Sequence, residues 1–337
     1  MKITLTALSL FFLIGFSAHA ADVNLAGYLF FDYSKGQEES SFHKGRIGGL
    51  EGGLMAAGSL ISRFDYALEL SFRPDMNVSL EQAWVGYTAS RSFSLRAGLI
   101  PVPFGRFNLI NRPYMSTLVQ PPLNAANLIP HRWREIGLEA SGEVAGFTYA
   151  VYIGNGLREA GSLAEGQQFT DNNTDKGRGF RLGAALSESI SVGYSRYWGR
   201  YDSQDSRELR MQALDAVWTT QGFKLAYERI WTDMENPEGY EAGRGSGYSV
   251  IGVMVISQFE PFVSFQKLAV EDPFHGPWFS GSGPAGKGIS RTNSRWAAGL
   301  IFLPEAGLFL KAEYDWNREE GEEKRDDLLT VQVALRF

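Results

Sequence analysis

The chain has 337 residues, a formal net charge of −6, no cysteine, and 23 Phe, 14 Tyr and 8 Trp. The lack of cysteine excludes disulfides and thiolate metal sites, and the acidic balance excludes the basic surface expected of a nucleic-acid-binding protein. Although 44% of the residues are hydrophobic, the mean hydropathy is −0.18, a combination that fits a wall with one apolar and one polar face.

The first twenty residues have the features of an export signal. Lys2 is followed by the apolar run 8–16, and Ala18-His19-Ala20 gives the small-x-small pattern of a signal-peptidase site. We therefore expect a cleaved signal peptide over 1–20 and a single mature domain over 21–337. The apolar run is too short to cross a bilayer as a helix, and no later stretch reaches about 18 uninterrupted apolar residues.

Beyond the signal, apolar and polar residues alternate in segments of about ten residues. Between residues 61 and 73, one face carries Phe64, Tyr66, Leu68, Leu70 and Phe72, and the other carries Arg63, Asp65, Glu69, Ser71 and Arg73. A period of two with this contrast predicts a strand with one apolar side. The same test predicts sixteen strands, in chain order at 23–33, 45–57, 61–73, 79–89, 92–101, 133–141, 145–155, 177–187, 189–199, 207–219, 221–232, 246–257, 259–270, 292–303, 306–316 and 327–337.

The connections between these segments show a second regularity. The odd-numbered connections, the third among them, are expected to be long, as at 34–44, 102–132, 156–176, 233–245 and 271–291. The even-numbered ones are expected to be short, as at Gly58-Ser59-Leu60, Ala89-Ser90-Arg91, Gly142-Glu143-Val144, Thr220, Gln258 and Pro304-Glu305. Alternation of long loops and short turns is typical of a bacterial outer-membrane barrel.

The predicted fold is therefore all-β, a transmembrane antiparallel barrel of about sixteen strands in the outer membrane of a Gram-negative bacterium. An even strand count brings both ends of the sheet to the same side, so that the first strand can pair with the last. The terminal Phe337, on an apolar face with Leu329, Val331, Val333 and Leu335, is similar to the C-terminal signature of outer-membrane proteins. Aromatic residues near strand ends are expected to form girdles at the membrane interfaces, namely Tyr28, Trp84, Tyr194, Trp198, Trp218, Trp231, Trp296, Tyr314 and Trp316.

The fifth connection, 102–132, is the third loop on the long-loop side, and we expect it to fold into the barrel and narrow it. From Gln82 to Arg134 the sequence contains no Asp, Glu or Lys. It does contain a group of arginines, of which we expect five to form an anion-binding pore constriction: Arg96, Arg106, Arg112, Arg132 and Arg134. The alternative is that these arginines pair with carboxylates across the wall, with Asp65 and Glu69 as candidates.

Three short motifs resemble the phosphate-selective porin O/P family. They are Leu80-Glu81-Gln82-Ala83-Trp84-Val85-Gly86-Tyr87, then Leu95-Arg96-Ala97-Gly98, then Val102-Pro103-Phe104-Gly105. The resemblance covers about 30 residues, and it implies a trimeric, sixteen-stranded diffusion pore. Because the constriction loop has no lysine, we expect a porin of this superfamily rather than a channel specific for phosphate.

The expected function is passive diffusion of small hydrophilic solutes through the outer membrane, with a mild preference for anions, by a homotrimer in contact with membrane lipid. No enzyme activity, cofactor, metal or nucleic acid is expected. The segment 171–175 lacks the Gly and Glu of a calcium loop, the histidines lack metal-ligand spacing, and no G-x-S-x-G elbow is present. The alternatives are a porin for neutral or cationic solutes, and a closed structural or adhesive barrel.

Overall fold

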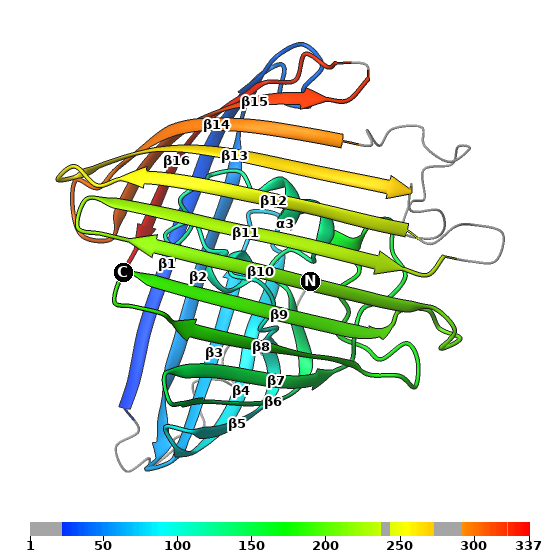
Figure 1. The fold of residues 1–337 in the computed structure, drawn as a ribbon. Helices are drawn as coiled ribbons and strands as arrows, with labels where there is room; N and C mark the ends of the chain where they lie inside the picture. The colour runs from blue at the N-terminus through cyan, green and yellow to red at the C-terminus, as the bar shows by residue number, and fades with distance from the viewer. Residues whose placement is uncertain (1–21, 237–242, 273–291, 322) are drawn as a thin grey trace, which may run out of the picture.

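The computed structural model describes residues 22–236, 243–272, 292–321 and 323–337. Within these residues, sixteen antiparallel strands form one closed barrel, in which each strand pairs with its neighbours in sequence and β16 pairs with β1 (Figure 1). The predicted fold class is confirmed, whereas the signal peptide predicted over 1–20 lies outside the described residues. The strands are β1 (Asp22–Gly36), β2 (Arg46–Ile61), β3 (Phe64–Phe72), β4 (Val78–Ser90), β5 (Phe93–Pro101), β6 (Arg134–Val144), β7 (Phe147–Gly154), β8 (Gly177–Ala185), β9 (Ile190–Arg200), β10 (Glu208–Thr219), β11 (Phe223–Met234), β12 (Gly243–Met254), β13 (Phe259–Asp272), β14 (Thr292–Phe302), β15 (Leu308–Glu319) and β16 (Leu328–Arg336).

The burial of side chains is the reverse of that in a water-soluble protein. On β3, Glu69 and Ser71 are 3% and 1% exposed, whereas the apolar Phe64 and Phe72 are 41% and 37% exposed. On β16, Thr330 is fully buried between exposed apolar neighbours. The polar face of each strand therefore lines the barrel interior and the apolar face forms the outer wall, as a barrel in lipid requires.

Three predicted connections are wrong in detail, and a fourth, at Ala89-Ser90-Arg91, is shifted because β4 continues to Ser90. The turn expected at Gly142-Glu143-Val144 is part of β6, which continues to Val144, so the chain turns at Ala145 and Gly146. The turn expected at Gly58-Ser59-Leu60 is part of β2, which continues to Ile61, so the chain turns at Ser62 and Arg63. Ser59 pairs with Asp65 across this longer hairpin, and its hydroxyl donates to the Asp65 carboxylate at 2.7 Å. The third connection, expected to be long, has only the five residues 73–77.

Two of the aromatic residues predicted for the outer girdles face the interior instead. The Tyr28 hydroxyl donates to the buried Glu51 carboxylate at 3.0 Å. The Trp84 indole N–H donates to the Gln82 side chain at 3.0 Å. In both cases a polar partner on the interior face offers the ring a hydrogen bond that the lipid-facing side cannot provide.

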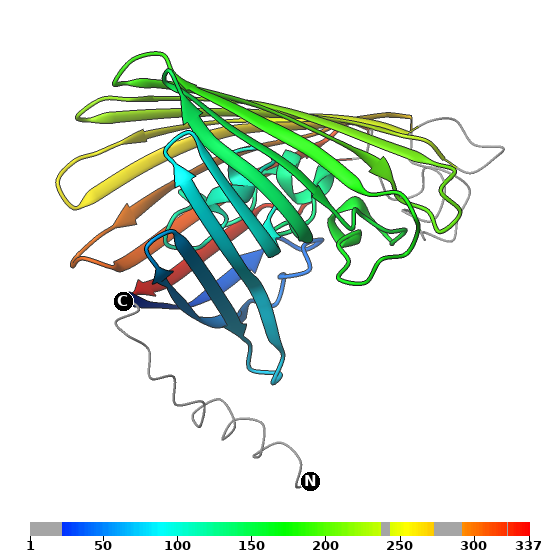
Figure 2. The same ribbon diagram turned by 90° about the horizontal axis from the view of Figure 1, so that it is seen from below.

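Within the described residues, no helix is both long enough and apolar enough to cross a membrane. The short helices α2 (Phe107–Ile110) and α3 (Leu123–Leu128) belong to the segment 102–133 between β5 and β6, and η1 (Leu163–Glu165) follows β7. The segment 102–133, here called the inner loop, lies inside the barrel, where α3 packs against β11, β12 and β13 (Figure 2). The end of the barrel from which it enters is called the long-loop end, and the opposite end the short-turn end.

Candidate functional site

The inner loop begins with a turn that a glycine makes possible. Gly105 has φ +64°, and a Cβ at this position would lie 2.4 Å from Glu228 Oε1. The Gly105 N–H donates to Ser195 Oγ at 3.1 Å, and the Arg106 N–H donates to Glu228 Oε1 at 2.7 Å. The Phe107 N–H reaches the same carboxylate at 3.2 to 3.3 Å. The Val-Pro-Phe-Gly motif thus directs the chain from the wall into the interior, where Glu228 receives it.

Two side chains of β15 hold the middle of the inner loop. Lys311 Nζ donates to two loop carbonyl oxygens, at 2.5 and 2.6 Å. The Glu313 carboxylate accepts the backbone N–H groups of Val119 and Gln120, at 2.7 and 3.1 Å. Because Glu228 belongs to β11 and these two side chains belong to β15, four strands further round the barrel, the loop is fixed to two separate regions of the wall.

The side of the inner loop next to β6–β13 is packed with apolar and aromatic groups. The rings of Phe104 and Trp133 pack at a tilt of 54° with centroids 5.4 Å apart, and Trp133 meets Tyr197 edge to face at 4.9 Å. All three rings are essentially buried. This packing occupies the interior beside β6 and β9, and the larger of the two cavities along the loop lies near β1, β2 and β16.

A polar cavity of about 200 Å³ occupies that space. Asp32, Glu51 and Gln332 line it from the wall, and Arg112 and Arg132 line it from the inner loop. A smaller cavity of about 30 Å³ lies on the other side of the loop and shares Phe107 and Ser116 with the first. The inner loop therefore separates the larger cavity, near β1, β2 and β16, from the smaller one, near β11 and β12.

Three of the five predicted arginines form ion pairs around the larger cavity. Arg112 donates from Nε and Nη2 to the Glu69 carboxylate at 2.8 and 3.0 Å. Arg132 lies 2.5 Å from Glu51, and Arg134 lies 3.5 Å from a carboxylate oxygen of Glu81. Burial alone would lower the pKa of Arg112, but the hydrogen bonds and charge of Glu69 raise it well above its usual range.

Arg96 stands apart from these three. It points into the barrel from β5, with its guanidinium 4.6 Å from the centre of the Trp84 ring and 3.5 Å from Glu139. These partners belong to the wall rather than to the inner loop. Its side chain is 40% exposed.

Arg106 differs from the others because no described carboxylate lies within 4.0 Å of its guanidinium. It lines the smaller cavity together with Lys224 of β11. Burial lowers the pKa of Arg106, and the negative charge of Glu228 offsets part of this effect. Lys224 was not among the predicted residues, although the alternation of β11 places it on the same face as Glu228.

His131 lies beside the paired arginines and lines the larger cavity. Its ring reaches solvent, but it is enclosed by the barrel. This enclosure, together with the charge of Arg132, lowers the pKa of His131 to about 4. The ring is therefore neutral at pH 7. Within the described part of the chain, no three His, Asp or Glu side chains gather in an arrangement that could hold a metal ion.

The described strands close into a sixteen-stranded barrel, and the loop after the fifth strand folds inside it. This architecture is the feature by which the chain can be compared with known structures. The fold matches that of outer-membrane porins. The structure resembles the outer membrane channel DcaP of Acinetobacter baumannii, with a TM-score of 0.70 and 12% identity over 95% of this chain and 99% of that one. It also resembles the trimer form of the outer membrane protein OmpT of Vibrio cholerae, with a TM-score of 0.67 and 11% identity over 94% of this chain and 100% of that one. A third similar structure is an anion-selective porin from Comamonas acidovorans, with a TM-score of 0.63 and 11% identity over 94% of this chain and 99% of that one.

Sequence comparison adds little to this structural likeness. No family model matches the chain. An uncharacterized protein of Aquifex aeolicus is 26% identical over 144 residues, which is 39% of this chain and 32% of that protein. The chain thus spans about a third of the length of this relative.

Proposed function

We propose that this protein is an outer-membrane porin through which small hydrophilic solutes diffuse passively past the inner loop. The observation that carries the proposal is the loop itself, which is anchored to two separate regions of the wall, by Glu228 of β11 and by Lys311 and Glu313 of β15. Cavities lined in part by charged side chains lie against it, one near β1, β2 and β16 and one near β11 and β12. A loop that only stabilised a closed barrel would not need charged side chains lining open space.

The apolar outer wall supports a location in the outer membrane. An antiparallel barrel satisfies its backbone hydrogen bonds within one closed sheet, which allows it to stand in hydrocarbon. The porin fold of the similar structures supports the same location, and the trimer form of the Vibrio OmpT supports a homotrimer here. Membership of the phosphate-selective porin O/P family stays a prediction from the three motifs.

We further propose a mild preference for anions, and the geometry favours Arg106 and Lys224 as its main source. Both cations line the smaller cavity, and neither has an ion-pair partner within 4.0 Å in the described chain. An unpaired cation attracts permeating anions more strongly than one already matched by a carboxylate. Arg96, Arg112, Arg132 and Arg134 remain candidate constriction residues, with charges that are partly or wholly compensated.

A second candidate is a porin for neutral or cationic solutes. The observation in its favour is the pairing of Arg112 with Glu69, of Arg132 with Glu51 and of Arg134 with Glu81. Interleaved charges of both signs produce little net electric field along the pore. A pore with little net field would select solutes by size and polarity instead of charge.

Single-channel recording in a planar bilayer under a KCl gradient tests the proposal. We expect open steps with a reversal potential that favours chloride, and a shift toward potassium in Arg106→Ala and further in Arg106→Ala/Lys224→Ala. Arg91→Ala is the matched control, because it also removes one arginine but from an exposed turn at the short-turn end. An equal preference for both ions in all variants would favour the second candidate, and folded protein without open steps would refute the porin function.

A further inference from the structure

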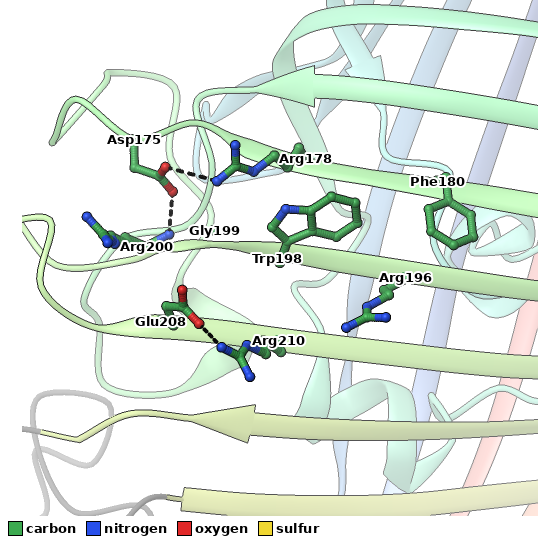
Figure 3. A pocket seen from close by; sticks show the side chains of 9 residues that line it. All are labelled: Asp175, Arg178, Phe180, Arg196, Trp198, Gly199, Arg200, Glu208 and Arg210. Carbon is green, nitrogen blue, oxygen red and sulfur yellow. Dashed lines mark hydrogen bonds and ion pairs between the residues drawn. The ribbon is translucent and has the colours of Figure 1, made fainter.

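The outer face of the barrel carries an unexpected group of cations near the long-loop end. Arg178 of β8, Arg196 and Arg200 of β9 and Arg210 of β10 line a hollow of about 490 Å³ (Figure 3). These four residues are here called the outer arginine cluster. A wall that faces lipid ordinarily excludes charged side chains, so a group of four requires a physical reason.

The alternation of β9 fixes the outward direction of these side chains. Ser195 and Tyr197 are buried inside the barrel, at 0% and 1% exposure. Successive side chains of a strand point to opposite faces, so Arg196, Trp198 and Arg200 stand on the outer wall.

The strand register brings the cluster together. Trp198 is paired with Arg178 on one side and with Arg210 on the other. With neighbouring strands ~4.8 Å apart, the backbones of Arg178 and Arg210 are about 10 Å from each other. Arg196 lies two residues further from the rim on the central strand.

Two described carboxylates compensate the cluster only in part. Asp175 lies 3.4 Å from Arg178 and accepts the backbone N–H of Arg200 at 2.7 Å. Glu208 forms an ion pair with Arg210. No described carboxylate lies within 4.0 Å of the guanidinium groups of Arg196 and Arg200, so two positive charges remain for an external anion.

The outer wall below the cluster is apolar. Two aromatic rings stand among the arginines of the hollow: Trp198 is level with Arg178 and Arg210, and Phe180 is level with Arg196 (Figure 3). Further toward the short-turn end, Leu182 and Leu214 are 49% and 42% exposed. The face therefore presents cations and aromatic rings together near the rim and aliphatic side chains beyond them, as a surface that spans the headgroup and acyl-chain regions of a lipid leaflet does.

We propose that the outer arginine cluster binds the phosphate groups of a phosphorylated, acylated glycolipid in the outer leaflet. The guanidinium fork matches phosphate oxygens with two parallel hydrogen bonds, and the apolar wall below receives the acyl chains. The proposal depends on the membrane location proposed above but not on conduction through the barrel. A soluble phosphate would use the arginines without the apolar wall, and a second copy of the chain would bring another surface against the same charges.

Native mass spectrometry of the full chain in detergent tests this binding. The probes are diphosphorylated lipid A, the same lipid with its phosphates removed, phosphatidylglycerol and inorganic phosphate. We expect diphosphorylated lipid A to bind at least about tenfold more tightly than the other three. In Arg196→Gln/Arg200→Gln, we expect that affinity to fall by at least about tenfold. These two side chains have no ion pair to lose, so the variant should fold, which a heat-dependent shift in gel mobility verifies.

The matched control is Arg244→Gln/Arg318→Gln, which removes two exposed arginines elsewhere on the outer wall and should retain binding. Equal binding of dephosphorylated lipid, or equal binding by the cluster variant, would overturn the proposal. So would displacement of the lipid by millimolar inorganic phosphate, or a change of oligomeric state in the cluster variant without a change in lipid binding. Conductance of the cluster variant should match wild type, so failure of the lipid site and failure of the porin function are separate results.

Discussion

Replacing Arg112 with alanine should weaken the barrel by an amount that its ion pair with Glu69 allows us to estimate. Glu69 accepts two hydrogen bonds from Arg112, at 2.8 and 3.0 Å, and one from Gln82 at 2.8 Å. The two side chains are 13% and 4% exposed. In Arg112→Ala the carboxylate keeps only Gln82, and removing one partner of a buried ion pair costs about 3 to 5 kcal/mol. Two charge-assisted hydrogen bonds at roughly 1.5 to 3 kcal/mol each give the same order.

The assay is urea unfolding in lipid vesicles, followed by tryptophan fluorescence. We expect Arg112→Ala to lose about 3 kcal/mol of unfolding free energy. Arg112→Ala/Glu69→Gln should lose less, roughly 1 to 2 kcal/mol, because no charge is then left unpaired. Arg91→Ala, with an exposed pair to Glu143, should lose less than about 1 kcal/mol. A single variant as stable as wild type, or a double variant less stable than the single one, would refute the reasoning.

Three further perturbations have defined outcomes. Gly105→Ala should destabilise the barrel by about 1 to 2 kcal/mol or more in the same assay, because the left-handed backbone of Gly105 is strained for any side chain. The Cβ of the alanine would also clash with Glu228. Unchanged unfolding free energy would contradict this prediction. Lys311→Met removes the donor to two loop carbonyls. Single-channel recordings of this variant should show larger current fluctuations in the open state than recordings of wild type. Identical current noise would show that Lys311 does not hold the inner loop in place. The pKa of His131 is about 4 in the folded chain and about 6.5 in the unfolded chain. The unfolded chain therefore binds more protons between these values, and the contribution of His131 to stability falls as the pH is lowered from 6.5 to 4. His131→Asn should show a smaller loss of unfolding free energy than wild type between pH 7 and pH 4.5, and equal losses would refute the assignment.

The wall could be predicted from sequence because its physical signal is local. Each strand carries its own alternation, as in β3 and β16, and the prediction therefore survives errors elsewhere in the chain. The sequence predicts the turn after β2 too early because Gly58 and Ser59 are common turn residues, whereas the pairing of Ser59 with Asp65 continues the strand. The sequence places Tyr28 and Trp84 in the outer girdles because ring type alone does not reveal an interior hydrogen-bond partner.

The charge state of the constriction could not be predicted in the same way. The sequence indicates a run of arginines without nearby carboxylates, but Glu51 comes from a strand 81 residues away from Arg132. Only the closure of the barrel places the two side chains together. Lys224 lies 118 residues after Arg106 on a different strand, so its place beside Arg106 likewise depends on the three-dimensional path of the inner loop.

The most direct test of a pore narrowed by the inner loop uses the absence of cysteine from the native chain. Asn111→Cys introduces one thiol where the inner loop lines the larger cavity, and Glu38→Cys places a control thiol on an exposed side chain between β1 and β2. Single-channel current is then recorded before and after addition of a negatively charged methanethiosulfonate reagent. The account predicts a stepwise loss of current in Asn111→Cys and none in Glu38→Cys. Unchanged current in Asn111→Cys, with modification verified by mass spectrometry, would contradict it.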